Sequence, residues 1–174
     1  MVRRLDRVGF EELFTGFSTA AFRLETLPAY QEPQERDAVE RFMAGRPPDD
    51  TWIQGYLEMV RTATRAGRRF ERVRVLERPP TDYQRFVMDV AARCNIPAGE
   101  DVRVLDDDEA AHRGLPMGRD FWLFDDERVA LMQFDGGTLQ GTELLIEPSS
   151  VERFVELRRR AWEAARVPGG ATGR

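Results

Sequence analysis

Acidic side chains and a single imidazole gather in the middle of the chain and could bind a divalent ion. Four consecutive acids occupy residues 106–109, and His112 follows them. On a helix, Asp108 and His112 would share one face, because they are four residues apart. Carboxylate oxygens and imidazole nitrogens are ligands of divalent ions, so with Asp125 and Asp126 they could serve a metal-assisted phosphodiesterase or nuclease. The alternative, which we favour, is a solvated acidic loop that holds no metal.

A second group of residues suggests an anion site. Arg72 and Arg74 lie on one side of an alternating segment, opposite Val73 and Val75, and Thr81 can begin the helix that follows. Arginines beside the end of a strand and the start of a helix are typical of phosphate or carboxylate binding. Arg85 lies one turn into that helix, and in the alternative Arg72, Arg74 and Arg85 pair with surface acids, for instance those of 106–109 or 125–127.

The segment DFWLFDDERVALMQFDGG, residues 120–137, predicts a hairpin with an acidic turn. Asp120 directly precedes the apolar pair Phe121 and Trp122. If Asp120 points inward, it needs an arginine partner, because a buried carboxylate is costly without one. The alternative is a residue in solvent at the start of a strand. We predict no catalytic residue, metal ligand or cofactor, and the predicted ligand-binding residues are Arg74, Thr81, Tyr83, Arg85, Asp120, Trp122 and Asp125.

These residues need a scaffold, and hydrophobic periodicity predicts an α/β fold with a mixed sheet of about five or six strands flanked by helices. Ser149 and Glu152 form a potential capping box for the last helix. The acidic stretch after the second main strand is expected to be a loop. Helices are expected over 8–17, 35–44, 51–66, 81–95 and from 149 onward, and strands around 22–24, 71–76, 102–105, 121–124, 129–134 and 144–147.

The length of 174 residues suits one domain with its own core. We expect that domain over residues 1–166, with a mainly helical extension at 8–66 packed on the sheet of 70–166, and a disordered tail at 167–174. The segment 70–106 reads as strand, helix, strand, which favours parallel pairing.

Composition excludes several kinds of chemistry. All 26 basic residues are arginine, so a catalytic lysine, a Schiff base or a P-loop lysine is excluded. One cysteine fits a reducing cytoplasm, and neither a signal peptide nor an apolar run of about 18 residues is visible. The net charge of -5 argues against direct binding of nucleic acid. We therefore expect a cytoplasmic protein without membrane or nucleic-acid contact.

Five blocks of the sequence resemble an uncharacterised actinobacterial family known as a domain of unknown function. The blocks are AAFRLETLPAY, RVRVLERPPTDYQRF, AGEDVRVL, LPMGRDFWLFDDERVALMQFD and the closing AW. The resemblance covers most of the chain. Members tend to be encoded beside helix-turn-helix regulators, which implies a regulator of that kind as the protein partner.

Residues 65–165 also resemble one unit of the phospholipase D-like superfamily, with an N-terminal helical extension. Active members carry His-x-Lys, then four residues and Asp, with histidine as the nucleophile and lysine holding the phosphate. If Asp125 stands at the aspartate position, Gly118 and Asp120 stand at the histidine and lysine positions. His112 is no substitute, because the lysine and aspartate positions after it would be Gly114 and Arg119. The resemblance therefore implies a pseudoenzyme, and it suggests a homodimer, because active sites in the superfamily need two units.

The sequence as a whole predicts a non-catalytic regulatory or interaction module. It would work with a helix-turn-helix regulator and sense a small anionic ligand. The alternative function is the metal-assisted phosphodiesterase or nuclease built on the acidic cluster.

Overall fold

The computed structural model describes residues 3–169 and shows a mixed sheet of seven strands in the order β1-β7-β6-β5-β2-β3-β4. The sequence predicted five or six strands. The one it missed, β1, is only three residues long, too short to show alternation. The strands are β1 Arg3–Leu5, β2 Ala20–Glu25, β3 Arg69–Leu76, β4 Asp101–Asp106, β5 Phe121–Phe124, β6 Arg128–Asp135 and β7 Thr138–Leu145.

One half of the sheet is parallel. Strand β3 pairs in parallel with β2 on one side and with β4 on the other. Helices connect these strands, as parallel pairing requires. They are α2 Arg36–Met43, α3 Gln54–Arg65 and α4 Asp82–Val90, with a π-helical turn at Ala91–Asn95 and a last short turn, α5, at Ile96–Ala98. The predicted strand, helix, strand unit is therefore confirmed.

The other half is antiparallel and begins with the predicted hairpin. Phe121 of β5 pairs with Leu131 of β6, and β6 pairs in turn with β7. Strand β7 was expected at 144–147 but starts at Thr138. The cause is the tight turn at Gly136 and Gly137, whose positive φ angles of 54° and 84° let the chain reverse at once.

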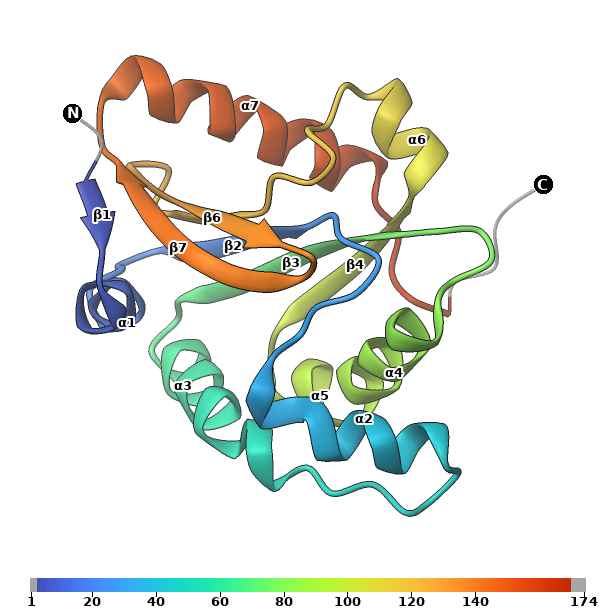
Figure 1. Ribbon diagram of the computed structural model, residues 1–174. Helices are drawn as coiled ribbons and strands as arrows, with labels where there is room; N and C mark the ends of the chain where they lie inside the picture. Colours follow the sequence, from blue (N-terminus) through green and yellow to red (C-terminus); the bar gives the residue numbers. More distant parts are fainter. Residues whose placement is uncertain (1–2, 170–174) are drawn as a thin grey trace.

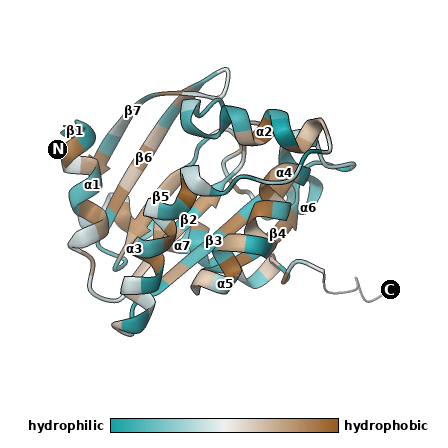
Figure 2. Cartoon of the chain, turned by 90° about the horizontal axis from the view of Figure 1, so that it is seen from below, coloured by the Kyte–Doolittle hydropathy of each residue, from teal (hydrophilic) through white to brown (hydrophobic). Residues whose placement is uncertain are grey.

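Helices cover both faces of the sheet (Figure 1). Helices α2 to α5 and α1 Arg7–Thr15 lie on one face, which we call the cavity face. Helices α6 Asp107–His112 and α7 Pro148–Ala164 pack on the opposite face. Two apolar clusters fill these layers, one built around Phe70 and Phe124 and the other around Phe22 and Leu123. Figure 2 shows apolar strands framed by helices that carry many polar residues.

Three local predictions need correction. The acidic stretch 107–112 is a helix and not a loop, since three acids in its first turn favour the positive N-terminal end of the helix dipole. Helix α7 starts at Pro148, whose fixed φ suits the first helical position, and no capping box forms at Ser149. The segment 8–66 does not only pack on the sheet of 70–166 but is part of it, since its strand β2 lies between β5 and β3.

Two further predictions concern the ends of the chain and the membrane. Of the tail expected at 167–174, residues 170–174 lie outside the described residues.

Among residues 3–169, no helix combines the length and the apolar character that crossing a bilayer demands.

Candidate functional site

Charged side chains meet on the cavity face because two parallel strands pair in register. Arg23 of β2 pairs with Arg72 of β3, and Glu25 pairs with Arg74. Side chains two residues apart on a strand point to the same face. All four therefore project to one side, while Phe22, Leu24, Val73 and Val75 fill the core on the other. The prediction that Arg72 and Arg74 share a side is confirmed.

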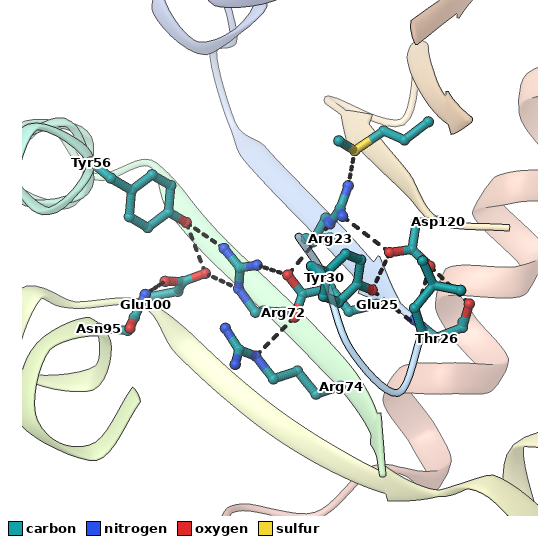
Figure 3. A network of polar contacts seen from close by, with 12 residues as sticks. Arg23, Glu25, Thr26, Tyr30, Tyr56, Arg72, Arg74, Asn95, Glu100 and Asp120 are labelled. Atoms are coloured by element: carbon teal, nitrogen blue, oxygen red, sulfur yellow. Dashed lines mark hydrogen bonds and ion pairs between the residues drawn. The ribbon is translucent and has the colours of Figure 1, made fainter. Parts of the chain in front are cut away.

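Glu25 is the centre of this network, which Figure 3 shows from close by. Its carboxylate contacts Arg72, lies 2.9 Å from Nε of Arg74 and is 3.7 Å from Nε of Arg23. Burial alone would raise the pKa of Glu25, but the three guanidinium groups outweigh it and lower the pKa to about 2. Glu25 is therefore a carboxylate throughout the physiological range.

Asp120 anchors one end of the network and has no exposed surface. Its carboxylate accepts hydrogen bonds from Nη2 of Arg23 at 3.1 Å and from the backbone N–H and hydroxyl of Thr26 at 2.9 and 2.8 Å. The hydroxyl of Tyr30 donates to it as well. Of the two alternatives for Asp120, the inward orientation with an arginine partner is the one found.

Glu100 anchors the other end. It accepts hydrogen bonds from Nε of Arg72 at 2.6 Å, from the Tyr56 hydroxyl at 2.9 Å and from Nδ2 of Asn95 at 2.7 Å. Burial and the neighbouring Glu100 raise the pKa of Tyr56, although the charge of Arg72 acts against them, so this phenol stays protonated. Arg72 thus joins the buried carboxylate of Glu100 to the partly buried carboxylate of Glu25, and it pairs with neither of the surface acidic groups named above.

A cavity of about 260 Å³ opens beside this network, between the sheet, α3, α4 and the connector 26–35. Three of its lining side chains hold buried polar atoms without a hydrogen-bond partner in residues 3–169: Nε1 of Trp52, Nη1 of Arg74 and Oδ1 of Asn95. The contact of Arg74 Nε with Glu25 is an ion pair but lacks the geometry of a hydrogen bond. Native proteins rarely leave such atoms unpaired, so their concentration at one cavity indicates a binding site.

Glu35 is a titratable group in the cavity wall. It ends the 3-10 turn Pro33–Glu35, is 6% exposed and accepts a hydrogen bond of 2.6 Å from the Tyr83 hydroxyl. Burial raises the pKa of its carboxyl to about 7; the hydrogen bond from Tyr83 opposes this, and the charges of Glu32 and Glu25 add to it. Glu35 therefore changes its charge near neutral pH.

Only Arg74 and Tyr83 of the seven predicted ligand-binding residues line this cavity. Thr81 caps α4 with a full capping box, and its hydroxyl donates to the Pro28 carbonyl at 2.7 Å. Arg85 pairs with Asp82 at the surface. Because these two point away from the cavity, the predicted cradle at the start of α4 is not assembled.

Trp122 and Asp120 belong to the packing around the site. Trp122 is 5% exposed and packs against Phe14 and Phe70, while the guanidinium of Arg72 lies 5.4 Å from its ring centre. Neither it nor Asp120 is part of the cavity wall described above. Both position the arginines that do reach it.

Asp125 has a structural role in the hairpin turn. It adopts a positive φ of 56°, and its carboxylate accepts hydrogen bonds from the backbone N–H groups of Ser18, Thr19 and Ala20 at 2.7 to 3.1 Å. Burial raises its pKa, but these bonds and the charge of Arg128 leave the pKa below its usual value. Asp125 thus fixes the entry of β2 next to β5.

The acidic residues of the alternative metal site do not converge. Within residues 3–169, no group of three or more acids, histidines or cysteines is arranged to hold a metal ion. Asp106 pairs with Arg78 and Arg166, and Glu109 pairs with Arg113 along α6. The local cause is the helix, which directs its first-turn acids to different sides.

The sequence did not reveal several residues of the candidate site. Glu25, Glu35, Glu100, Trp52 and Asn95 all contribute to the network or the cavity. One signal was available: charged residues at 23, 25, 72 and 74 alternate with large apolar ones, which indicates two strands that are both buried and both charged on one side. Nothing comparable marks Glu35 or Asn95.

Comparisons with known proteins identify a family and a solved structure of similar fold. A search of curated proteins found no match. Among solved structures that match is one titled "Structure of TrmBL2, an archaeal chromatin protein, shows a novel mode of DNA binding", with a TM-score of 0.49, 13% identity and coverage of 95% of this chain. The chain spans about half of that protein, 52% of its length. The prediction of no direct contact with nucleic acid is corrected against this finding, since net charge alone does not exclude such contact.

The family is shown by a match over nearly the whole chain. A model described as "Domain of unknown function (DUF6879)" matches residues 9–168, which include all of β2 to α7. This fits the resemblance noted from the sequence blocks. The chain belongs to the DUF6879 family.

Proposed function

We propose that this chain is a non-catalytic regulatory module that binds a small ligand through an anionic group in the cavity at Arg74. The observation that carries the proposal is the buried guanidinium of Arg74, a residue that is 8% exposed and lines the cavity, and whose Nη1 donor has no hydrogen-bond partner among residues 3–169.

The energetics favour a ligand there. A buried donor without a partner costs about 1–3 kcal/mol, and a hydrogen bond to a charged group contributes about 1.5–3 kcal/mol. An anionic group on a ligand would satisfy Arg74 and Nε1 of Trp52 together. Because the network already fixes the face on which Arg74 lies, the site is formed before the ligand arrives.

The connector 26–35 offers a way to report ligand binding. It crosses over the network and supplies Tyr30, Glu32 and Glu35 to the cavity wall. Hydrogen bonds from the hydroxyl groups of Tyr30 and Thr26 to Asp120 attach the connector to the sheet. A ligand that contacts this wall would stabilise one position of the connector, and its outer surface would carry that change to a partner.

The non-catalytic part is supported by the positions aligned with the phospholipase D-like motif. Gly118 has no side chain to act as nucleophile, and Asp120 is engaged with Arg23 and Thr26. We keep the phospholipase D-like resemblance and the pseudoenzyme as parts of this proposal. The metal-assisted hydrolase receives no support from the placement of the acids.

The partner part rests on the family resemblance, which implies a helix-turn-helix regulator encoded nearby. Affinity capture of the tagged protein from its native host, followed by mass spectrometry, tests it. A stoichiometric regulator in repeated captures supports the proposal, and its absence from all of them counts against this part. The homodimer stays a prediction that light scattering can test against the chain mass of 20.0 kDa.

The ligand part is tested by calorimetric titration of small carboxylates, phosphate and amino acids, one by one. We expect at least one to bind, and Arg74→Gln to weaken that binding about tenfold or more, since a charged hydrogen bond is lost. Arg85→Gln is the matched control, because Arg85 lies outside the cavity with a side chain 54% exposed. Equal loss in both variants, or full binding by Arg74→Gln, would contradict the proposed site.

A further inference from the structure

The cavity at Arg74 has unsatisfied groups of both kinds, which limits the chemistry of its ligand. Nη1 of Arg74 and Nε1 of Trp52 are donors, whereas Oδ1 of Asn95 is an acceptor, and none of the three has a partner in residues 3–169. Asn95 is 2% exposed, and its amide nitrogen already donates a hydrogen bond to Glu100. A simple anion would satisfy the donors and leave the acceptor unpaired.

The charges around the cavity favour a ligand without a large net charge. Three buried guanidinium groups contact three carboxylates, those of Glu100 and Asp120, which are buried, and that of Glu25, which is partly buried. The carboxyl of Glu35 is a further acidic group in the wall. A dianion such as phosphate would be drawn by Arg74 and repelled by Glu25 and Glu35, while a ligand that also carries a cation would be attracted by both ends.

The lining side chains and the volume of the cavity limit what the uncharged part of the ligand can be. Aromatic rings of Tyr30, Tyr83, Trp52 and Phe134 line the cavity, and the rings of Tyr30 and Phe134 lie 5.2 Å apart. About 260 Å³ is less than the volume of a drug-sized pocket, so only a small molecule fits. An apolar or aromatic body would pack against these rings.

We infer that the ligand is an amino-acid zwitterion with an apolar side chain. Its carboxylate accepts hydrogen bonds from Arg74 and Trp52, and its ammonium donates to Asn95 Oδ1 and to the Glu35 carboxyl. The Tyr83 hydroxyl, which donates to Glu35, holds that carboxyl in place. This inference rests on the proposed function, because it names the ligand class of the same cavity.

The test is calorimetric titration of the full chain with each of the twenty protein amino acids, and then with analogues of the tightest one. One analogue lacks the amine, one has an amide in place of the carboxylate, and inorganic phosphate is the third probe. We expect an apolar amino acid to bind, and each analogue to bind about tenfold more weakly or worse, since each leaves buried groups unpaired.

Two mild variants keep the test valid if Arg74 variants fail to fold. Trp52→Phe keeps an aromatic side chain but removes the Nε1 donor together with part of the indole, so it should weaken binding of the amino acid and of the deaminated acid alike. Glu35→Gln should weaken the amino acid about tenfold but should not weaken the deaminated acid, because only the ammonium contacts Glu35 and the amide carries no charge that would repel an anion. Arg85→Gln is again the control.

The outcomes separate the two proposals. If the deaminated acid or phosphate binds as tightly as any amino acid, and Arg74→Gln abolishes this, the ligand class is wrong while the site stands. If Glu35→Gln weakens the deaminated acid as much as the amino acid, the assigned orientation is wrong. If no amino acid, carboxylate or phosphate binds, both proposals fail.

Discussion

The replacement Glu35→Gln gives the sharpest test of the electrostatics around the cavity. Glu35 is buried, and its pKa is raised from 4.5 to about 7. In the pH window between these values the folded chain holds a proton that the unfolded chain has released. Stability from this group is therefore fully present below about pH 4.5 and is lost as the pH rises through about 7.

The size of the effect follows from the shift. A difference of one pKa unit corresponds to 1.36 kcal/mol, so a rise from 4.5 to about 7 costs the folded state about 3 kcal/mol once Glu35 is ionised. The amide that replaces the carboxyl would be neutral at every pH and can still accept the hydrogen bond from Tyr83. We expect the free energy of unfolding of Glu35→Gln to be about 3 kcal/mol higher than that of wild type at pH 8 and nearly equal to it at pH 4.

Urea denaturation at intervals from pH 4 to pH 8 measures this difference. Glu25 does not interfere, because its pKa of about 2 places its own titration below this range. Glu40→Gln on α2 is the control, since Glu40 is exposed and lies outside the cavity wall described above. If the wild-type and Glu35→Gln curves stay parallel from pH 5 to pH 8, the buried, proton-holding Glu35 described here is refuted.

Substitutions at three further positions test the scaffold, each by urea denaturation at pH 7. Asp120→Asn should lower the unfolding free energy by about 3 kcal/mol, because it breaks the buried ion pair with Arg23, whose remaining ion pair joins its Nε to Glu25 over 3.7 Å; unchanged stability would contradict that pairing. Asp125→Ala should cost about 2 kcal/mol through the loss of an acceptor for three backbone donors, and Asp125→Asn should cost less. Gly99→Ala should be destabilising by about 2 kcal/mol, since φ is +107° and a Cβ would lie 2.8 Å from Oγ1 of Thr64; a neutral effect would show that this turn relaxes.

Local patterns in the sequence determined much of the fold. Alternation in 71–76 indicated β3, and the signal at Thr81 indicated the start of α4, where a full capping box forms. The same alternation placed Arg72 and Arg74 on one side of their strand. These features depend on neighbours a few residues apart, so the sequence carries them directly.

The tertiary structure alone decided which acids meet these arginines. The partners Glu25 and Glu100 lie 47 and 28 positions away from Arg72 along the chain. They reach it because β2 inserts between β5 and β3 and because the turn at Gly99 returns the chain to the sheet. No local pattern encodes such a register.

The cavity has the same origin. It exists where the connector 26–35, α3 and α4 fail to fill the space over the sheet, and Trp52, Arg74 and Asn95 come to it from three separate elements. Sequence could show that Arg74 faces one side, but whether its Nη1 finds a partner depends on every side chain packed around it, and none of those in residues 3–169 provides one. Local spacing thus fixes the direction of a side chain, while only the packing of distant segments fixes what that side chain meets.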